Sequence, residues 1–128
     1  MQIVYAASSE LGGDAESHPA TGPCCYSPLP DAAQTAEGRT ISRQLLRSAT
    51  SVAANYRAVC RARSSADFTS KLGLVLEGAD ETLFWLELLV DAGLVRRDQI
   101  ELTLNEANQL VSIFVASLRT VKGLKSEI

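Results

Sequence analysis

Apolar residues recur at helical spacing in three long stretches of this chain, at residues 36–63, 66–91 and 99–122. A period of three to four residues places such side chains on one face of an α-helix, whereas a β-strand needs a period of two. The apolar face of the first stretch comprises Ile41, Leu45, Ala49, Val52, Tyr56, Val59 and Cys60. That of the third stretch comprises Ile100, Leu104, Ala107, Val111, Phe114 and Leu118. The expected fold class is therefore all-α.

Residues that start and end helices flank the three stretches. Ser, Thr and Asp side chains accept hydrogen bonds from the first N–H groups of a helix, and glycine readily adopts the left-handed conformation that ends one. The expected N-terminal caps are Thr35, then Ser64 or Ser65, then Asp98 paired with Glu101, and the expected ends are Gly93 and Gly123. Long helices joined by short turns must be antiparallel neighbours. We predict an up-and-down helical bundle over residues 35–128.

The N-terminal part of the chain has a different composition. Residues 1–34 hold all four prolines and show no sustained apolar period. Proline interrupts both helices and central strands, so we predict an irregular arm over these residues.

Cysteine and histidine usage argues against a disulfide framework and a zinc site. Cys24 and Cys25 are adjacent, Cys60 stands alone, and His18 is the only histidine. We expect three reduced thiols and no metal or other cofactor. No window approaches the ~18 uninterrupted apolar residues of a membrane span, and the first residues lack the pattern of a secretory signal. We expect a cytoplasmic protein without a membrane partner.

The segment 39–63 contains six arginines and no acidic residue, although the formal charge of the chain is −3. At 100° per residue, five of these arginines fall within about 80° of one another on the helix surface, away from the apolar face. They are Arg39, Arg43, Arg47, Arg57 and Arg61. Ser48, Ser51 and Asn55 lie between this stripe and the apolar face, where polar side chains usually bond to a neighbouring helix or to carbonyls of their own helix. Alternatively, they extend the arginine surface with hydrogen-bonding groups.

The arginine stripe has three interpretations. It is a solvated face, or it pairs with an acidic surface of another subunit, or it contacts the phosphates of RNA or DNA, which arginine can bind with two hydrogen bonds.

The second helix supplies an acidic counter-surface. Its carboxylates cluster on one side of the helix and are Glu77, Asp80, Glu81, Glu87 and Asp91. Apolar side chains, among them Phe84 and Trp85, cover most of the remaining circumference. Packing against a single core buries about 100° of the circumference of a helix, so this helix has more apolar surface than one core can bury. We therefore expect a homo-oligomer.

Catalytic motifs find no support in the sequence. It contains no phosphate-binding glycine loop and no nucleophile elbow, and the only histidine lies in the predicted arm. The carboxylates at 77, 80 and 81 lack the Glu-x-x-His partner that di-metal bundles use. We expect a protein that is not an enzyme.

The order of the basic and acidic segments resembles a known family. The basic signature runs from Arg43 to Arg57 as RQLLRSATSVAANYR, and the acidic-aromatic segment runs from Glu77 to Glu87 as EGADETLFWLE. Together with ADF at 66–68 and KLG at 71–73, they resemble the four-helix-bundle proteins encoded in intervening sequences of bacterial large-subunit ribosomal RNA genes. The resemblance covers about residues 36–122 and extends to the accessory protein of diversity-generating retroelements.

This resemblance implies an antiparallel four-helix bundle that assembles into a five-fold ring or barrel. The accessory proteins bind nucleic acid and a reverse transcriptase through a basic surface. By analogy, the resemblance implies that RNA or DNA and a reverse transcriptase are candidate partners of this chain. The matching positions are Arg43, Arg47, Ser51, Asn55 and Arg57, with Glu77, Asp80, Glu81 and Glu87 on the second helix. Tyr56 and Trp85 join this set as candidate interface residues.

Two features depart from the family pattern. Members normally have a full amphipathic helix before the position of Thr35, where this chain has its proline-rich arm, so either the arm replaces that helix or the core has three helices. Retroelement accessory proteins are also strongly basic, whereas this chain has a pI of about 5.1. We therefore expect an oligomeric scaffold, with a nucleic-acid-binding accessory protein as the alternative.

Overall fold

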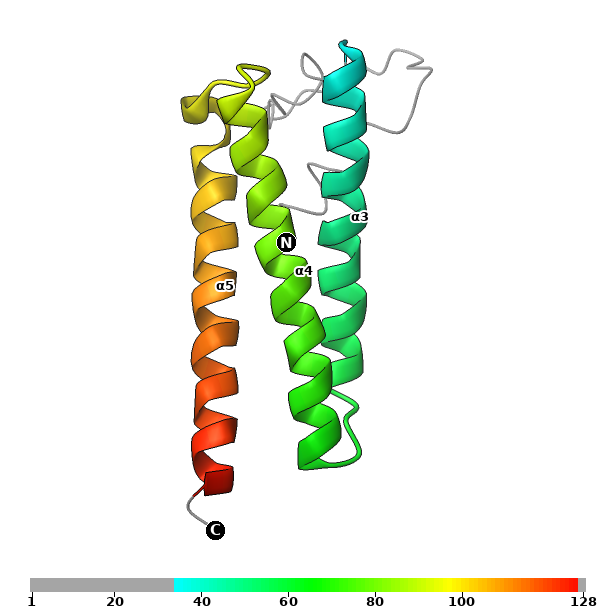
Figure 1. The fold of residues 1–128 in the computed structure, drawn as a ribbon, viewed down its shortest axis with the longest axis vertical. Helices are drawn as coiled ribbons and strands as arrows, with labels where there is room; N and C mark the ends of the chain where they lie inside the picture. Colours follow the sequence, from blue (N-terminus) through cyan, green and yellow to red (C-terminus); the bar gives the residue numbers. More distant parts are fainter. Residues whose placement is uncertain (1–33, 127–128) are drawn as a thin grey trace, which may run out of the picture.

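Three long helices form the part of the chain that the structure describes. The computed structural model describes residues 34–126, with side chains up to residue 123. Helix α3 spans Ala36–Val59, α4 spans Ser65–Asp91 and α5 spans Arg97–Ser126. Successive helices run in opposite directions, and α4 lies between α3 and α5 (Figure 1). The expected all-α, up-and-down architecture is confirmed, whereas the predicted arm, Cys24, Cys25 and His18 lie before the described residues.

The N-terminus of α3 and that of α4 have the predicted side-chain caps. Thr35 Oγ1 accepts a hydrogen bond from the N–H of Gly38 at 3.0 Å. Ser64 Oγ accepts one from the N–H of Asp67 at 3.1 Å, which selects Ser64 over its neighbour as the cap of α4. Each cap satisfies an N–H group that has no partner within the helix.

Helix α3 ends at Val59, so the predicted extension to residue 63 is wrong. The N–H groups of Arg61 and Ala62 donate to the carbonyls three residues earlier, both at 3.1 Å, which tightens the chain into a turn. The reason is local, because Ser64 must adopt an extended conformation to cap α4 and the chain has to leave α3 before it.

Helix α4 ends in a Schellman motif centred on Gly93, as its glycine predicted. The N–H of Gly93 donates to the Val90 carbonyl at 2.9 Å, and the N–H of Leu94 donates to the Leu89 carbonyl at 3.0 Å. Gly93 has φ = 69°, in the left-handed region that side chains disfavour. The short turn that follows directs the chain into α5.

Helix α5 begins and ends differently from the prediction. It starts at Arg97, and the Gln99 Oε1 accepts a hydrogen bond from the N–H of Arg96 at 3.1 Å, so Asp98 lies inside the first turn instead of capping it. The helix also continues through Gly123 to Ser126. Glycine costs about 1 kcal/mol in a helix relative to alanine, which is not enough to stop a helix without a competing local structure.

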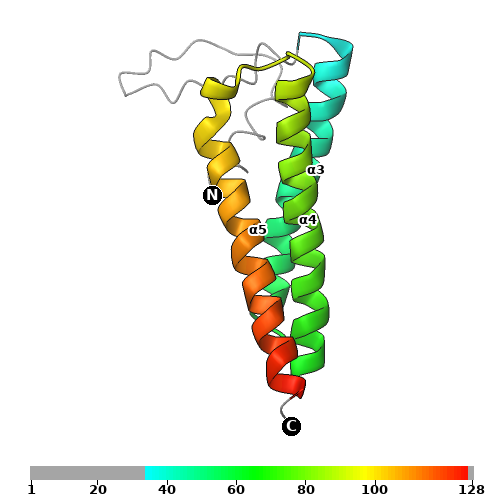
Figure 2. The ribbon, with the colours of Figure 1, turned by 60° about the vertical axis from the view of Figure 1, so that its left-hand side comes forward.

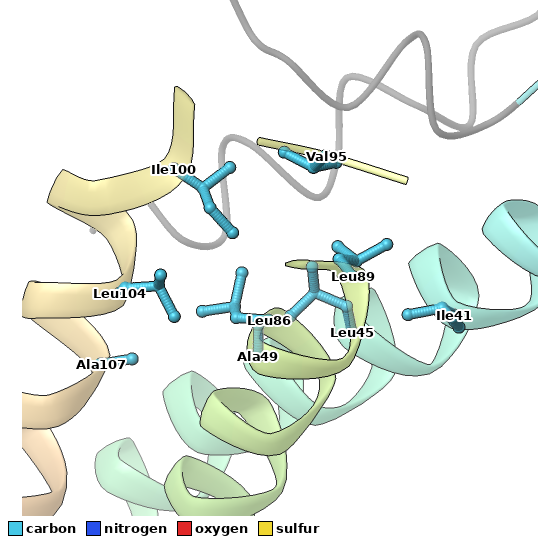
Figure 3. Close-up of a cluster of buried hydrophobic side chains, with 9 residues drawn as sticks. All are labelled: Ile41, Leu45, Ala49, Leu86, Leu89, Val95, Ile100, Leu104 and Ala107. Atoms are coloured by element: carbon cyan, nitrogen blue, oxygen red, sulfur yellow. The ribbon is translucent and has the colours of Figure 1, made fainter. Parts of the chain in front are cut away.

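Two clusters of buried apolar side chains hold the helices together. The first lies near the α4–α5 turn, where Leu86 and Leu104 point towards each other between α4 and α5 (Figure 3). It consists of Ile41, Leu45, Ala49, Leu86, Leu89, Val95, Ile100, Leu104 and Ala107. The second lies towards the α3–α4 turn and consists of Val52, Val59, Leu72, Val75, Ala79, Phe114 and Leu118. Fully burying one such leucine contributes about 1.5–3 kcal/mol.

Small residues bring α3 and α4 close together between the clusters. A methyl group added at Gly78 would lie 3.0 Å from Val52 Cγ2. Any residue other than glycine at this position would therefore require α3 or the Val52 side chain to move. Ser48 and Thr82 are both buried here, and the Thr82 hydroxyl donates to Ser48 Oγ at 3.0 Å. The Ser48 hydroxyl also reaches the Leu45 carbonyl at 3.0 Å. Ser48 thus makes both kinds of bond expected at the border of the arginine stripe.

Tyr56 and Cys60 were predicted to be buried, and both are exposed. Tyr56 is 48% exposed, and its ring lies 6.0 Å from that of Phe114 on α5. Helix α3 runs behind α4 in the turned view, and it packs mainly against α4 and only slightly against α5 (Figure 2). Two neighbours bury less of α3 than the periodicity of its apolar residues predicts.

None of the described helices is long and apolar enough to cross a membrane.

Candidate interaction site

Four arginines form an exposed face on α3. Arg39, Arg43, Arg47 and Arg57 are all exposed, and they lie opposite the side that α3 buries. We call these four residues the arginine face. Its register follows from helix geometry, because residues three, four or seven positions apart share one side.

Arg61 was predicted to continue this stripe, and the structure separates it from α3. It lies in the turn after the helix, where its N–H donates to the carbonyl of Ala58 at 3.1 Å. Its guanidinium therefore belongs to the turn and not to the helical row.

One arginine of this face pairs with an acid of α4. The Arg47 guanidinium forms an ion pair with the Glu81 carboxylate, and its Nε donates to Gln44 Oε1 at 3.0 Å. The Trp85 indole N–H donates to the same Glu81 oxygen at 3.2 Å. The Arg47 side chain is 61% exposed, so solvent screens the pair and its contribution to stability stays below about 1 kcal/mol. The geometry orients Trp85 along the surface of α4.

The side of α4 that faces away from the core combines apolar and acidic groups. We call Leu74, Glu77, Asp80, Phe84 and Glu87 the outer face of α4; all five are exposed. The Leu74 and Phe84 side chains are each 50% exposed. The Phe84 ring meets the Trp85 ring edge-on, with centroids 5.0 Å apart. The surplus apolar surface expected on this helix therefore lies outside the core of the subunit.

Ser51 and Asn55, the polar members of the family signature, contact each other. Asn55 Nδ2 donates to Ser51 Oγ at 3.1 Å along α3. Both are partly buried, beside the exposed Tyr56. Tyr56 and Cys60 border a small hollow of about 170 Å³ among the three helices, whose other walls include Phe68, Leu72 and Phe114.

The structure adds two cations that were not among the predicted site residues, Arg63 and Lys71. With Arg57 and Arg61 they line a hollow of about 800 Å³ beside the α3–α4 turn. The absence of acids from residues 39–63 could have indicated that Arg63 belongs to the basic surface. Nothing in the sequence indicated that Lys71 lies beside it. Within residues 34–126, no three His, Cys, Asp or Glu side chains gather closely enough to hold a metal ion.

Asp67 lies in the wall of this hollow and is held by two donors. Its Oδ2 accepts from Lys71 Nζ at 2.8 Å and from the N–H of Arg63 at 3.0 Å. The hydrogen bond from Lys71 lowers the pKa of Asp67, and the bond from the Arg63 backbone lowers it further. The carboxylate is thus ionised at neutral pH and fixes Lys71 in place.

Comparison with known proteins identifies the family. The 23S rRNA-intervening sequence protein family matches residues 25–116, which include the arginine face and the outer face of α4. The chain belongs to this family. The resemblance carried by the basic signature and the acidic-aromatic segment is therefore confirmed.

A solved relative of the intervening-sequence protein shares its fold. It is the crystal structure of a protein with unknown function from the S23 ribosomal protein family of Bacteroides thetaiotaomicron. The sequences are 33% identical, the match covers 70% of this chain and 83% of the relative, and the TM-score is 0.63. Comparison with curated proteins gives no match. These comparisons therefore define the family and the fold of the chain. Neither the family description nor the solved relative names an activity.

Proposed function

We propose that this intervening-sequence protein is a non-enzymatic assembly protein whose copies associate through the outer face of α4. The observation that supports this most strongly is the half-exposure of Leu74 and Phe84 among carboxylates on one helix face. Large apolar side chains surrounded by charged groups are typical of protein–protein contact surfaces. Burying them against a second copy would remove their apolar area from water.

Charge complementarity supports a second copy as the partner. The outer face of α4 carries Glu77, Asp80 and Glu87, and the arginine face lies on another helix of the same subunit. Because the two surfaces differ, α4 of one copy would meet α3 of the next in a head-to-tail contact, which forms a ring when the rotation closes. Five copies is the number that the family resemblance favours. Charge pairing there would fix register and partner choice more than it adds stability.

Sedimentation velocity of the full chain tests the proposal. We expect the wild-type protein at micromolar concentration to sediment as about five copies of the 13.7 kDa chain. The double variant Leu74→Asp with Phe84→Asp should sediment as a monomer, because it places charges in the buried contact. A matched control is Leu102→Asp, because Leu102 is 78% exposed on α5. A monomeric wild-type protein, or equal dissociation of the control, would contradict the proposal.

Binding of RNA or DNA is the second candidate, and the exposure of the arginine face favours it. Four arginines on one helix side could contact successive phosphates, and a ring would repeat them in each subunit. Gel-shift titration at two salt concentrations tests this, since phosphate binding weakens steeply with salt. Arg43→Glu with Arg47→Glu should then abolish binding and leave the oligomer intact. Loss of the oligomer in this variant would instead assign the arginines to assembly.

A further inference from the structure

A basic hollow lies at the end of the bundle where α3 turns into α4. Its lining consists of Ala54, Arg57 and Ala58 from α3, Arg61 and Arg63 from the turn, and Asp67 and Lys71 from α4. The hollow has a volume of about 800 Å³ and is an open depression of the surface, because Ala54, Arg57, Arg61 and Arg63 are all exposed.

Two local features create this hollow. The end of α3 at Val59 lets the chain carry Arg61 and Arg63 around the turn, so that they approach Lys71 on α4. The lining residues Ala54 and Ala58 end at their methyl groups, which leaves space that longer side chains would fill. Neither feature follows from the helical periodicity of the sequence.

The charge of the hollow is strongly positive. Four cations face a single carboxylate, and that carboxylate is already bonded to Lys71 and to the backbone of Arg63. Within residues 34–126, the structure records no ion pair for the guanidinium groups of Arg57, Arg61 and Arg63. Like charges collected in one hollow repel one another, and a multiply charged anion would relieve that repulsion.

We propose that this hollow binds a terminal phosphate or a diphosphate group. Guanidinium groups form paired hydrogen bonds with phosphate oxygens, and a phosphate monoester carries close to two negative charges at neutral pH. A phosphodiester carries one charge per group, so it neutralises the hollow less completely. The space beyond the phosphate accommodates a nucleoside or the first nucleotide of a strand. This site goes beyond the proposed assembly, because Arg61, Arg63 and Lys71 belong to neither the arginine face nor the outer face of α4, and the hollow shares only Arg57 with the arginine face.

Isothermal titration calorimetry of the full chain with pyrophosphate at low salt tests the site. We expect saturable binding with one ligand per subunit. Arg61→Gln with Arg63→Gln should weaken it by about a hundredfold, because each hydrogen bond from a charged group contributes about a tenfold change or more. Both residues are exposed and lie outside the helices, so the fold should persist. The matched control, Arg96→Gln with Arg97→Gln, removes two exposed arginines at the opposite end of α4 and should change binding less than twofold.

A second variant tests the shape of the hollow without changing its charge. Ala54→Leu adds a bulky side chain to the lining at an exposed position of α3 and should weaken pyrophosphate binding at least tenfold. Absence of pyrophosphate binding by the wild-type protein at millimolar concentration, or equal loss in the Arg96/Arg97 control, would overturn the proposal. Its failure would leave the sedimentation result unaffected, so the two proposals are tested separately.

Oligonucleotides distinguish the two sources of the phosphate. If a 5′-phosphorylated RNA oligomer binds at least tenfold more tightly than its 5′-hydroxyl counterpart and competes with pyrophosphate, the site takes the end of a strand. If pyrophosphate binds and the 5′-phosphate has no effect, the site takes a free phosphorylated compound. Equal binding of both oligomers without competition by pyrophosphate would refute the site and assign binding to the phosphodiester backbone elsewhere.

Discussion

The Thr82 hydroxyl donates a hydrogen bond to Ser48 Oγ at 3.0 Å, and this bond joins α4 to α3 between the two apolar clusters. Thr82 Oγ1 also lies 2.7 Å from the carbonyl oxygen of Gly78, and Ser48 reaches the Leu45 carbonyl at 3.0 Å. The two hydroxyls have two protons for three acceptors, so they bond to each other and to the carbonyl of one helix at a time.

A double-mutant cycle measures this contact. Ser48→Ala and Thr82→Val should each lower the free energy of unfolding by about 1 kcal/mol, because a typical hydrogen bond contributes about that much. The double variant should lose less than the sum, with a coupling of about 0.5–1.5 kcal/mol in urea unfolding. Strictly additive losses would show that the two hydroxyls do not stabilise each other.

Gly78 and Gly73 lie in different surroundings within α4, so substitutions at the two positions should have opposite effects. A methyl group at Gly78 meets Val52 Cγ2 at 3.0 Å, whereas one at Gly73 has nothing within 4 Å. Gly73→Ala should stabilise the protein by about 0.5–1 kcal/mol through helix propensity. Gly78→Leu should destabilise it by about 1–3 kcal/mol, because the added atoms force α3 and α4 apart. Thermal unfolding measures both, and a neutral Gly78→Leu would refute the close approach.

Asp67 should give the protein a pH dependence in the acid range. Its folded pKa lies below the unfolded value because of Lys71 and the Arg63 backbone, so the stabilisation is present above the unfolded pKa of about 4. It is lost as the pH falls through the folded pKa. Urea unfolding between about pH 2 and pH 6 should show a shallower slope in Asp67→Asn than in the wild-type protein.

The Lys71→Met variant provides the control for this assignment. It removes the largest cause of the shift and keeps the aliphatic part of the side chain. The Asp67 pKa, followed by nuclear magnetic resonance, should rise towards its ordinary value. An unchanged pKa would assign the shift to the backbone bond alone.

The Arg47–Glu81 pair should contribute little to the stability of the subunit. Both side chains are solvent-accessible, so Arg47→Ala should lower the free energy of unfolding by less than about 1 kcal/mol, and added salt should reduce the difference. Unfolding should be measured under conditions in which the chain is monomeric. A loss of several kcal/mol would mean that the pair is more deeply desolvated than its exposure indicates.

The sequence by itself determined the all-α class, the family, the start of α3 and both ends of α4. Capping at Thr35 and Ser64 and the left-handed turn at Gly93 involve residues within a few positions of each other, and apolar periodicity is likewise a local property. Such features can be predicted because backbone geometry fixes them before distant parts of the chain meet. Local signals were misread at the end of α3, where the cap of the next helix competes, and at both ends of α5, where Asp98 lies inside the first turn and Gly123 does not end the helix.

The tertiary structure decided which of the amphipathic surfaces are buried. Periodicity placed Tyr56 on the same face as Val52, but the positions of α4 and α5 leave Tyr56 half exposed. The contact between Ser48 and Thr82 spans 34 positions, and the hollow gathers cations from a helix, a turn and the next helix. These relationships depend on the distance and register between helices, which side-chain packing fixes and no local pattern of residues contains.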